Sequence, residues 1–307
     1  MEKSHELYKR VEVAIPATTA NLGSGFDCLA LALNLWNTVI LETGVQAITI
    51  SGEGEHSLSR GPDNLVYQAV RTLLDAAGVS MNNFSLICHN VIPLERGLGS
   101  SSAAVVGGLL AANALCDKPF PLEEILHMAA KLEGHPDNVA AAIFGGCQIV
   151  VQDGQEILAA PVPIPAAIRA VLFIPDQSIS TNQARLVLAS EVSREDAVFN
   201  LSRVALLVNA LATNQTMFLR RATQDRIHQR HRRILFPSMD LIFQAAMAAG
   251  ALGVFLSGAG STILALAQGR EMTIGYEMMD VAEKSGVSGS VRVLDLSAKG
   301  AQEVRLE

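Results

Sequence analysis

The sequence contains few aromatic residues and no long hydrophobic run. Aromatic side chains make up 5% of the 307 residues, so leucine, valine, isoleucine and alanine must fill the core. Half of the residues are hydrophobic, which is enough for this purpose. No apolar run reaches the roughly 20 residues of a transmembrane helix, and the polar start, Met1 to Glu6, lacks the apolar segment of a signal peptide. We therefore expect no membrane as a partner.

Cysteine is also scarce. The four cysteines are Cys28, Cys88, Cys116 and Cys147, and no two of them form a C-x-x-C pair. This spacing favours neither a zinc site nor a disulfide framework. Their neighbours are apolar or small, so we expect reduced, buried thiols in a cytoplasmic protein.

Basic segments are short, and the net charge is −7. A protein that binds nucleic acid needs a basic surface, whereas the longest basic segment here is residues 226–233. Nucleic acid is therefore not an expected partner. Any anionic ligand must be bound by a local arrangement of donors.

Hydrophobic periodicity predicts a mixture of strands and helices without strict alternation, which favours an α+β fold in two lobes. The predicted strands cover residues 11–15, 29–40, 47–51, 84–91, 170–174 and 291–296, with a strand-loop-strand unit at 253–267. The predicted helices cover residues 63–77, 101–115, 121–133, 197–211 and 238–249. The proline-rich segment 161–165 disfavours helix and central strand, so we predict domains at residues 1–163 and 164–307.

One glycine- and serine-rich segment follows a predicted strand and precedes a predicted helix. Gly97 and Gly99 allow positive φ angles and a close approach of the backbone to a ligand. The serines after them lie where a helix begins, and there free N–H groups and the helix dipole favour a phosphate. An ordinary turn with a serine N-cap is the alternative. The predicted nucleotide-phosphate contacts are Pro93, Leu94, Glu95, Arg96, Gly97, Leu98, Gly99, Ser100, Ser101, Ser102 and Ala103.

The string from Pro93 to Ala104, P-L-E-R-G-L-G-S-S-S-A-A, resembles the second motif of the GHMP small-molecule kinases. Residues 16–27, P-A-T-T-A-N-L-G-S-G-F-D, are similar to the first motif in its homoserine-kinase form, and residues 256–262 resemble the glycine-rich third motif. The resemblance covers nearly the whole chain. It implies a ribosomal-protein-like N-terminal lobe, a ferredoxin-like C-terminal lobe, ATP and Mg²⁺ as cofactors, and a homodimer.

The homoserine-kinase form of the first motif implies L-homoserine as the acceptor and a role in threonine biosynthesis. By resemblance, Asn21 and Asp27 face its amino end, and Thr181 and Arg185 of the T-x-x-A-R stretch face the substrate. Arg232 would supply a second carboxylate-binding arginine, although Arg230 and His231 replace the proline and tyrosine of the family pattern. A solvated charge run is the alternative for residues 226–233.

Further contacts also follow from the resemblance. Ser101 and Glu133 would bind Mg²⁺; a different spacing would instead select His127, which is a poor ligand for this ion. Asn64 would contact adenine, with a helix N-cap as an alternative or additional role. Gly260 would lie beside the acceptor, unless its segment is a simple hairpin turn.

Residues 133–139, E-G-H-P-D-N-V, carry the expected catalytic groups. His135 and Asn138 would orient the substrate, and we expect Asn138 and Arg185 to act in catalysis. An asparagine cannot act as a base, so the resemblance implies direct in-line phosphoryl transfer without a carboxylate base. The alternatives are another GHMP enzyme of the mevalonate-pathway type and a non-catalytic nucleotide-binding homologue.

Overall fold

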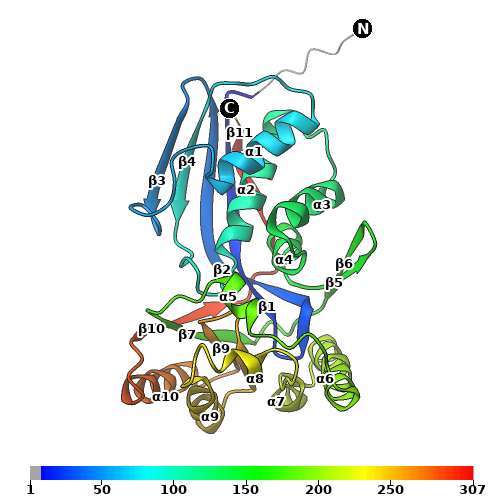
Figure 1. Ribbon diagram of the computed structural model, residues 1–307, viewed down its shortest axis with the longest axis vertical. Helices are drawn as coiled ribbons and strands as arrows, with labels where there is room; N and C mark the ends of the chain where they lie inside the picture. Colours follow the sequence, from blue (N-terminus) through cyan, green and yellow to red (C-terminus); the bar gives the residue numbers. More distant parts are fainter. Residues whose placement is uncertain (1–7, 307) are drawn as a thin grey trace.

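The computed structural model describes residues 8–306 and has the predicted α+β architecture. Two lobes lie one above the other, and each has its own sheet (Figure 1). Within residues 8–306, no helix is both long and apolar enough to cross a membrane.

The first lobe carries a seven-stranded sheet with helices packed on one side of it (Figure 1). Its strands are β1 (Arg10–Asn21), β2 (Gly25–Thr43), β3 (Ala47–Gly52), β4 (Phe84–Asn90), β5 (Cys147–Asp153), β6 (Glu156–Val162) and β11 (Gln302–Leu306). Its helices are α1 (Leu65–Ala76), α2 (Ser100–Leu115), α3 (Leu122–Glu133) and α4 (Asp137–Phe144). The strand order is β11-β1-β2-β4-β3, and β5 pairs with β2 and β6. β1 and β2 form a long antiparallel hairpin that reaches down to the second lobe.

The second lobe carries a four-stranded antiparallel sheet of order β10-β7-β9-β8. Its strands are β7 (Arg169–Pro175), β8 (Gly253–Leu256), β9 (Ile263–Ala267) and β10 (Gly289–Asp295). Its helices are α5 (Thr181–Leu186), α6 (Arg194–Ala212), η1 (Thr216–Phe218), α7 (Leu219–Ala222), α8 (Gln229–Arg232), α9 (Met239–Ala249) and α10 (Glu271–Lys284).

The chain changes from the first sheet to the second between Val162 and Arg169, where prolines are dense. β11 then returns to the first sheet and pairs with β1. The predicted second domain, 164–307, therefore includes a strand of the first lobe's sheet. This strand was not predicted from the sequence because it is short and contains charged residues at alternating positions.

Helix α2 lies in the middle of the first lobe, and 13 of its 16 residues are buried. Such a helix must be apolar or small on all sides. A Cβ atom at Gly108 would lie 2.6 Å from the Val66 carbonyl oxygen of α1, and one at Gly107 would lie 2.7 Å from Ile15 of β1. Small residues therefore let α1, α2 and the sheet pack closely, which fixes where the first residues of α2 lie.

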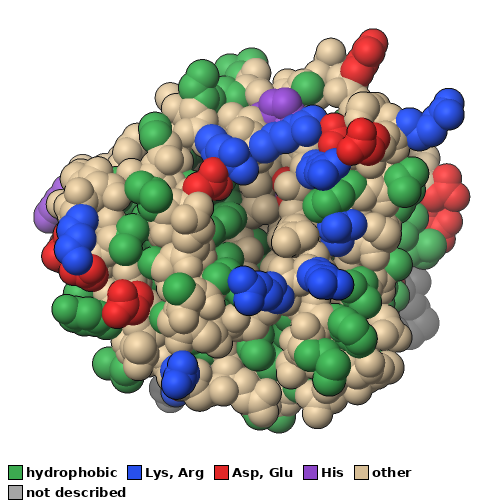
Figure 2. Space-filling model, turned by 90° about the horizontal axis from the view of Figure 1, so that it is seen from below, with side chains coloured by type: hydrophobic (Ala, Val, Ile, Leu, Met, Phe, Trp, Pro, Cys, Tyr) green, Lys and Arg blue, Asp and Glu red, His purple; other side chains and the backbone are tan. Residues whose placement is uncertain are grey.

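The cysteines are all free thiols; Cys28 is half-buried, and Cys88, Cys116 and Cys147 are buried. Burial raises the pKa of Cys28 and Cys88 to about 11. Viewed from below, the second lobe shows Lys and Arg side chains around a central hollow (Figure 2). This basic surface is local, because the whole chain carries a net charge of −7.

Candidate active site

A cleft of about 920 Å³ is lined by residues of both lobes. This volume suits a nucleotide and a small acceptor together. With one exception, all the site residues that the sequence predicts line the cleft. The exception is Ala103, which is fully buried because it lies inside the first turn of α2, where its amide donates to the Gly99 carbonyl.

Three glycine-bearing segments meet at the floor of the cleft: the β1–β2 turn, the loop before α2 and the β8–β9 connection. The Ser257 hydroxyl lies 2.6 Å from the Gly97 carbonyl oxygen and 2.8 Å from the Thr19 hydroxyl. The Gly258 amide donates to the Ala20 carbonyl at 3.1 Å, and the Thr262 amide donates to the Arg96 carbonyl at 3.2 Å. The three segments that resemble the GHMP kinase motifs thus form one structural unit.

Gly97 and Gly99 have φ angles of +70° and +69°. A Cβ at Gly97 would lie 2.0 Å from the Ser257 carbonyl oxygen, and a Cβ at Gly99 would lie 1.9 Å from the Thr18 hydroxyl. Both positions therefore require glycine for conformation and for space.

The N-terminus of α2 points into the cleft with no side chain capping it. Its N-cap is Gly99, and Ser100, Ser101 and Ser102 form its first turn. The Ser102 hydroxyl is buried and has no hydrogen-bond partner among the described residues. Free amides, an unpaired hydroxyl and the helix dipole together fit an anion such as a phosphate.

Ser101 and Glu133 lie in contact, because the Ser101 hydroxyl donates to the Glu133 carboxylate. Glu133 ends α3, and its side chain is 8% exposed. His127, on the same helix, does not line the cleft. Residues 8–306 contain no group of three His, Cys, Asp or Glu side chains that could hold a metal alone. One serine and one glutamate fit Mg²⁺, which takes few protein ligands and completes its shell with phosphate and water.

Asp27 and Arg185 form a two-pronged ion pair, with both N···O distances at 3.1 Å. The two side chains are 38% and 40% exposed, so they face the cleft. Thr181 lies one turn before Arg185, at the start of α5, and also lines the cleft. Asn21 stabilises the β1–β2 turn. Its side-chain nitrogen donates to the Gly258 carbonyl at 2.9 Å, and its side-chain oxygen accepts from the Asp27 backbone amide at 3.0 Å.

Asn138 and its neighbour Asp137 begin α4 at the edge of the cleft. The Asn138 side-chain oxygen accepts from the Thr18 hydroxyl at 2.7 Å. The Asp137 carboxylate accepts the Asn138 backbone amide at 2.7 Å and lies 3.1 Å from His135 Nδ1. Burial alone would lower the pKa of His135, but the bond to Asp137 and the charges of Asp137 and Glu133 raise it above its ordinary value.

Arg232 lies in the short helix α8 and is 3% exposed. Burial lowers its pKa to about 10, so the guanidinium stays charged at neutral pH. Its neighbour His228 is completely buried. Burial and the positive charge of Arg232 lower the pKa of His228 from its ordinary 6.5 to about 4, against the opposing charge of Asp225. His228 is therefore neutral at pH 7.

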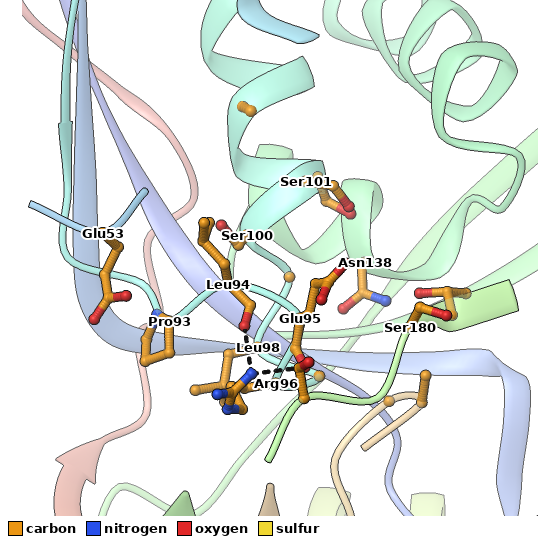
Figure 3. Close-up of a pocket in the computed structure, with 18 of the residues that line it drawn as sticks. Glu53, Pro93, Leu94, Glu95, Arg96, Leu98, Ser100, Ser101, Asn138 and Ser180 are labelled. Atoms are coloured by element: carbon orange, nitrogen blue, oxygen red, sulfur yellow. Dashed lines mark hydrogen bonds between the residues drawn. The ribbon is translucent and has the colours of Figure 1, made fainter. Parts of the chain in front are cut away.

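Asn64 and Arg96 are engaged with the protein itself. Asn64 is the N-cap of α1, and its side-chain oxygen accepts from the amides of Val66 and Tyr67. The N-cap role is therefore present, and the adenine contact stays a prediction. The Arg96 guanidinium donates to carbonyls within its own loop and to the Pro175 carbonyl at 2.7 Å. Figure 3 shows this loop with Ser100, Ser101 and Asn138 around one space.

Some residues in or near the cleft are not among the predicted site residues. Glu53 and Arg292 line the cleft from opposite lobes, and Asp137 stands beside Asn138. Glu53 and Arg292 belong to no recognisable motif. His228 is buried and does not itself line the cleft. It lies within the segment that resembles the family's arginine stretch, and this location is the only feature of the sequence that points to it.

The space at Gly97 predicts a stability difference between two alanine variants. Gly97→Ala adds a clash with a backbone carbonyl to the cost of a positive φ. Gly154→Ala has a similar φ of +61° with no atom within 4 Å of the new Cβ. We expect Gly97→Ala to lower the free energy of unfolding by about 2–4 kcal/mol and Gly154→Ala by about 1 kcal/mol. Chemical denaturation of both variants measures this, and equal losses would contradict it.

The buried neutral state of His228 predicts a pH-dependent stability. Below pH 6.5 the unfolded chain binds a proton at this residue, whereas the folded chain does not until about pH 4. The stabilising contribution is therefore complete above pH 6.5 and is lost as the pH falls from 6.5 to 4, by up to about 3 kcal/mol. Chemical denaturation at several pH values gives the free energy of unfolding as a function of pH. Between pH 4 and 6.5 this free energy should change less with pH in His228→Gln than in the wild type. An equal pH dependence in both proteins would contradict the assignment.

Comparison with known proteins places these observations in a family. The GHMP kinase N-terminal domain model matches residues 64–146, and the GHMP kinase C-terminal model matches residues 203–272. A homoserine kinase from Moorella thermoacetica is 42% identical over 290 residues, which are 94% of this chain and 98% of that protein. A homoserine kinase from a Synechocystis species is 41% identical over 96% of this chain and 98% of its own length.

Solved structures agree. The crystal structure of homoserine kinase from Cytophaga hutchinsonii matches with a TM-score of 0.88 at 28% identity, over 99% of both chains. Mevalonate diphosphate decarboxylase from Staphylococcus aureus has a TM-score of 0.70 at 12% identity, over 98% of this chain and 99% of that one, which shows a shared fold only. The chain belongs to the GHMP kinase family, among the homoserine kinases.

Proposed function

We propose that this protein transfers the γ-phosphoryl group of ATP to the side-chain hydroxyl of L-homoserine, giving ADP and O-phospho-L-homoserine for threonine biosynthesis. One observation carries the proposal: an acidic and a basic side chain, Asp27 and Arg185, stand paired in the cleft that also receives the N-terminus of α2. Its relatives named homoserine kinase, at about 40% identity over nearly the full chain, support the same activity.

The Asp27–Arg185 pair suits an amino acid. Homoserine carries an ammonium and a carboxylate on one carbon. Its carboxylate can therefore take the place of Asp27 beside Arg185, and its ammonium can take the place of Arg185 beside Asp27. Arg185 then binds the carboxylate through its planar fork, and Asp27 binds the ammonium. Arg232 adds a second positive charge. His135 and Asn138 face the hydroxyl end of the substrate in this proposal. The remaining walls are formed by Thr181, Asn21 and Gly260.

The nucleotide lies at the other end of the cleft in this proposal. The amides of the first turn of α2 and the loop from Pro93 to Ser102 bind its phosphates. Asn64, already the N-cap of α1, retains one side-chain N–H for the base. Ser101 and Glu133 hold Mg²⁺, which when bound neutralises charge on the transferred phosphoryl group.

Proton removal needs no carboxylate base in this proposal. Asn138 cannot accept a proton, and its oxygen is already occupied by the Thr18 hydroxyl. Asn138 therefore orients the acceptor hydroxyl, and Arg185 stabilises the negative charge of the acceptor carboxylate. Positioning of the reactants supplies most of the rate enhancement. The hydroxyl proton passes to the transferred phosphate or to water. The buried carboxylate of Asp137 is the competing proton acceptor, since it also lines the cleft.

The oligomeric state and location are part of the same proposal. We propose a homodimer in the cytoplasm, as the family resemblance implies. Light scattering of the purified protein measures the first directly, and a monomeric mass would contradict it.

An acceptor panel tests the activity. Purified protein with ATP and Mg²⁺ should release ADP with L-homoserine and not with mevalonate or galactose. Turnover with mevalonate would favour another GHMP enzyme, and ATP binding without turnover would favour a non-catalytic homologue.

Removal of Mg²⁺ tests the proposed metal site. Replacing Mg²⁺ with excess chelator should abolish ADP release, and Glu133→Gln should raise the Mg²⁺ concentration needed for half-maximal rate by about tenfold or more.

Two amide–carboxylate exchanges test how the proton leaves. Asn138→Asp should introduce a new acidic pKa into the pH profile of kcat if the wild type has no base. Asp137→Asn should keep at least about a tenth of the wild-type kcat, because loss of a general base costs about a hundredfold or more. Loss of turnover in Asp137→Asn with ATP and homoserine binding intact would assign the base to Asp137.

A further inference from the structure

His228 occupies a rigid, fully buried position beside the acceptor end of the cleft. Its exposed fraction is 0%. The Asp225 carboxylate, also buried, accepts the backbone amides of Ile227, His228 and Gln229 at 2.9, 3.0 and 2.7 Å. These bonds fix the backbone on which His228 stands.

Both ring nitrogens of His228 have partners, and the partners define the tautomer. Nε2 lies 2.8 Å from the Gly23 carbonyl oxygen, which can only accept, so Nε2 carries the hydrogen. Nδ1 is then an acceptor, and Arg232 Nη1 donates to it at 3.0 Å. The ring also stacks on Phe26, with centroids 5.1 Å apart. His228 thus joins the turn that carries Asp27 to the guanidinium of Arg232.

Arg232 is held on three sides by these contacts. Nη1 also donates to the Gly258 carbonyl at 2.8 Å, and Nε donates to the Ala184 carbonyl at 3.2 Å. The remaining nitrogen, Nη2, has no acceptor among residues 8–306, and Arg232 lines the cleft. One nitrogen of a fixed guanidinium is therefore left for a ligand.

We propose that His228 is a positioning residue for the amino-acid acceptor: it holds Arg232 against Gly258 so that Nη2 meets the acceptor carboxylate. The proposal rests on the proposed function, in which Arg232 binds that carboxylate. Only the neutral Nε2–H form can do this, because a protonated ring would turn a donor toward the guanidinium. Burial favours the neutral form.

Two amide variants separate the two bonds of the ring. His228→Asn places an acceptor oxygen near the position of Nδ1 and loses the donor to Gly23. His228→Gln places a donor near the position of Nε2 and loses the acceptor for Arg232. We expect His228→Gln to raise KM for L-homoserine by about tenfold or more and to change KM for ATP by less than about twofold. His228→Asn should keep KM for homoserine within about threefold of the wild type.

A second acceptor shows whether the effect acts through Arg232. L-homoserinol carries a hydroxymethyl group in place of the carboxylate, so Nη2 loses its negatively charged partner and retains at most a neutral hydroxyl acceptor. The ratio of kcat/KM for homoserine to kcat/KM for homoserinol should fall about tenfold in His228→Gln. A ratio equal to that of the wild type, whatever the overall rate, would mean that His228 only supports packing, and it would overturn the proposal.

The wild type provides the controls. Its turnover of homoserine is measured first, so failure there counts against the proposed function alone. ¹⁵N NMR of the wild-type imidazole should show the Nε2–H tautomer, and this measurement can overturn the proposal even if His228→Gln does not fold. An Nδ1–H tautomer would overturn the proposal.

Discussion

Close backbone packing around Gly97 and Gly99 is the constraint on which the rest of the site depends. At these positions the loop before α2 touches the β8–β9 connection and β1, with no room for a side chain. Because these contacts join segments from both lobes, they set the position of the α2 N-terminus relative to Arg185 and Arg232 in the second lobe. A Cβ at either glycine would clash with these neighbouring segments and displace the amides at the start of α2.

Local charge, not overall charge, defines the ligands of this cleft. The chain is acidic, yet α2 presents a positive dipole end and Arg185 and Arg232 present guanidinium groups. Asp27 neutralises Arg185 in the ion pair. An ion pair that is almost 40% exposed contributes at most about 1 kcal/mol, so a zwitterionic ligand can replace it at little cost. In the proposed function, the pair therefore leaves a site for an amino acid without creating a strongly charged surface.

The segment from Asp225 to Arg233 shows how the chain departs from its family pattern without changing the inside of the site. Asp225, His228 and Arg232 have buried side chains and share the inner side of this segment. Arg230, which replaces a proline, is exposed and pairs with Asp196 at 2.8 Å. The change at position 230 thus affects the outer side, where Arg230 forms a salt bridge.

The sequence by itself determined the α+β class, most strands, five of the ten α-helices in residues 8–306 and the segments that supply the site, because periodicity and glycine–serine spacing are local properties. It also led to a site set of which all but Ala103 line one cleft, since the motif residues were taken from a family pattern. Only the tertiary structure decided that β11 returns to the first sheet, that Asn64 caps α1, and that Glu53 and Arg292 line one cleft. The same holds for the contacts of His228 with Gly23 and Phe26, which lie far from it in sequence. Such contacts depend on packing between distant segments, and no local pattern of residues encodes them.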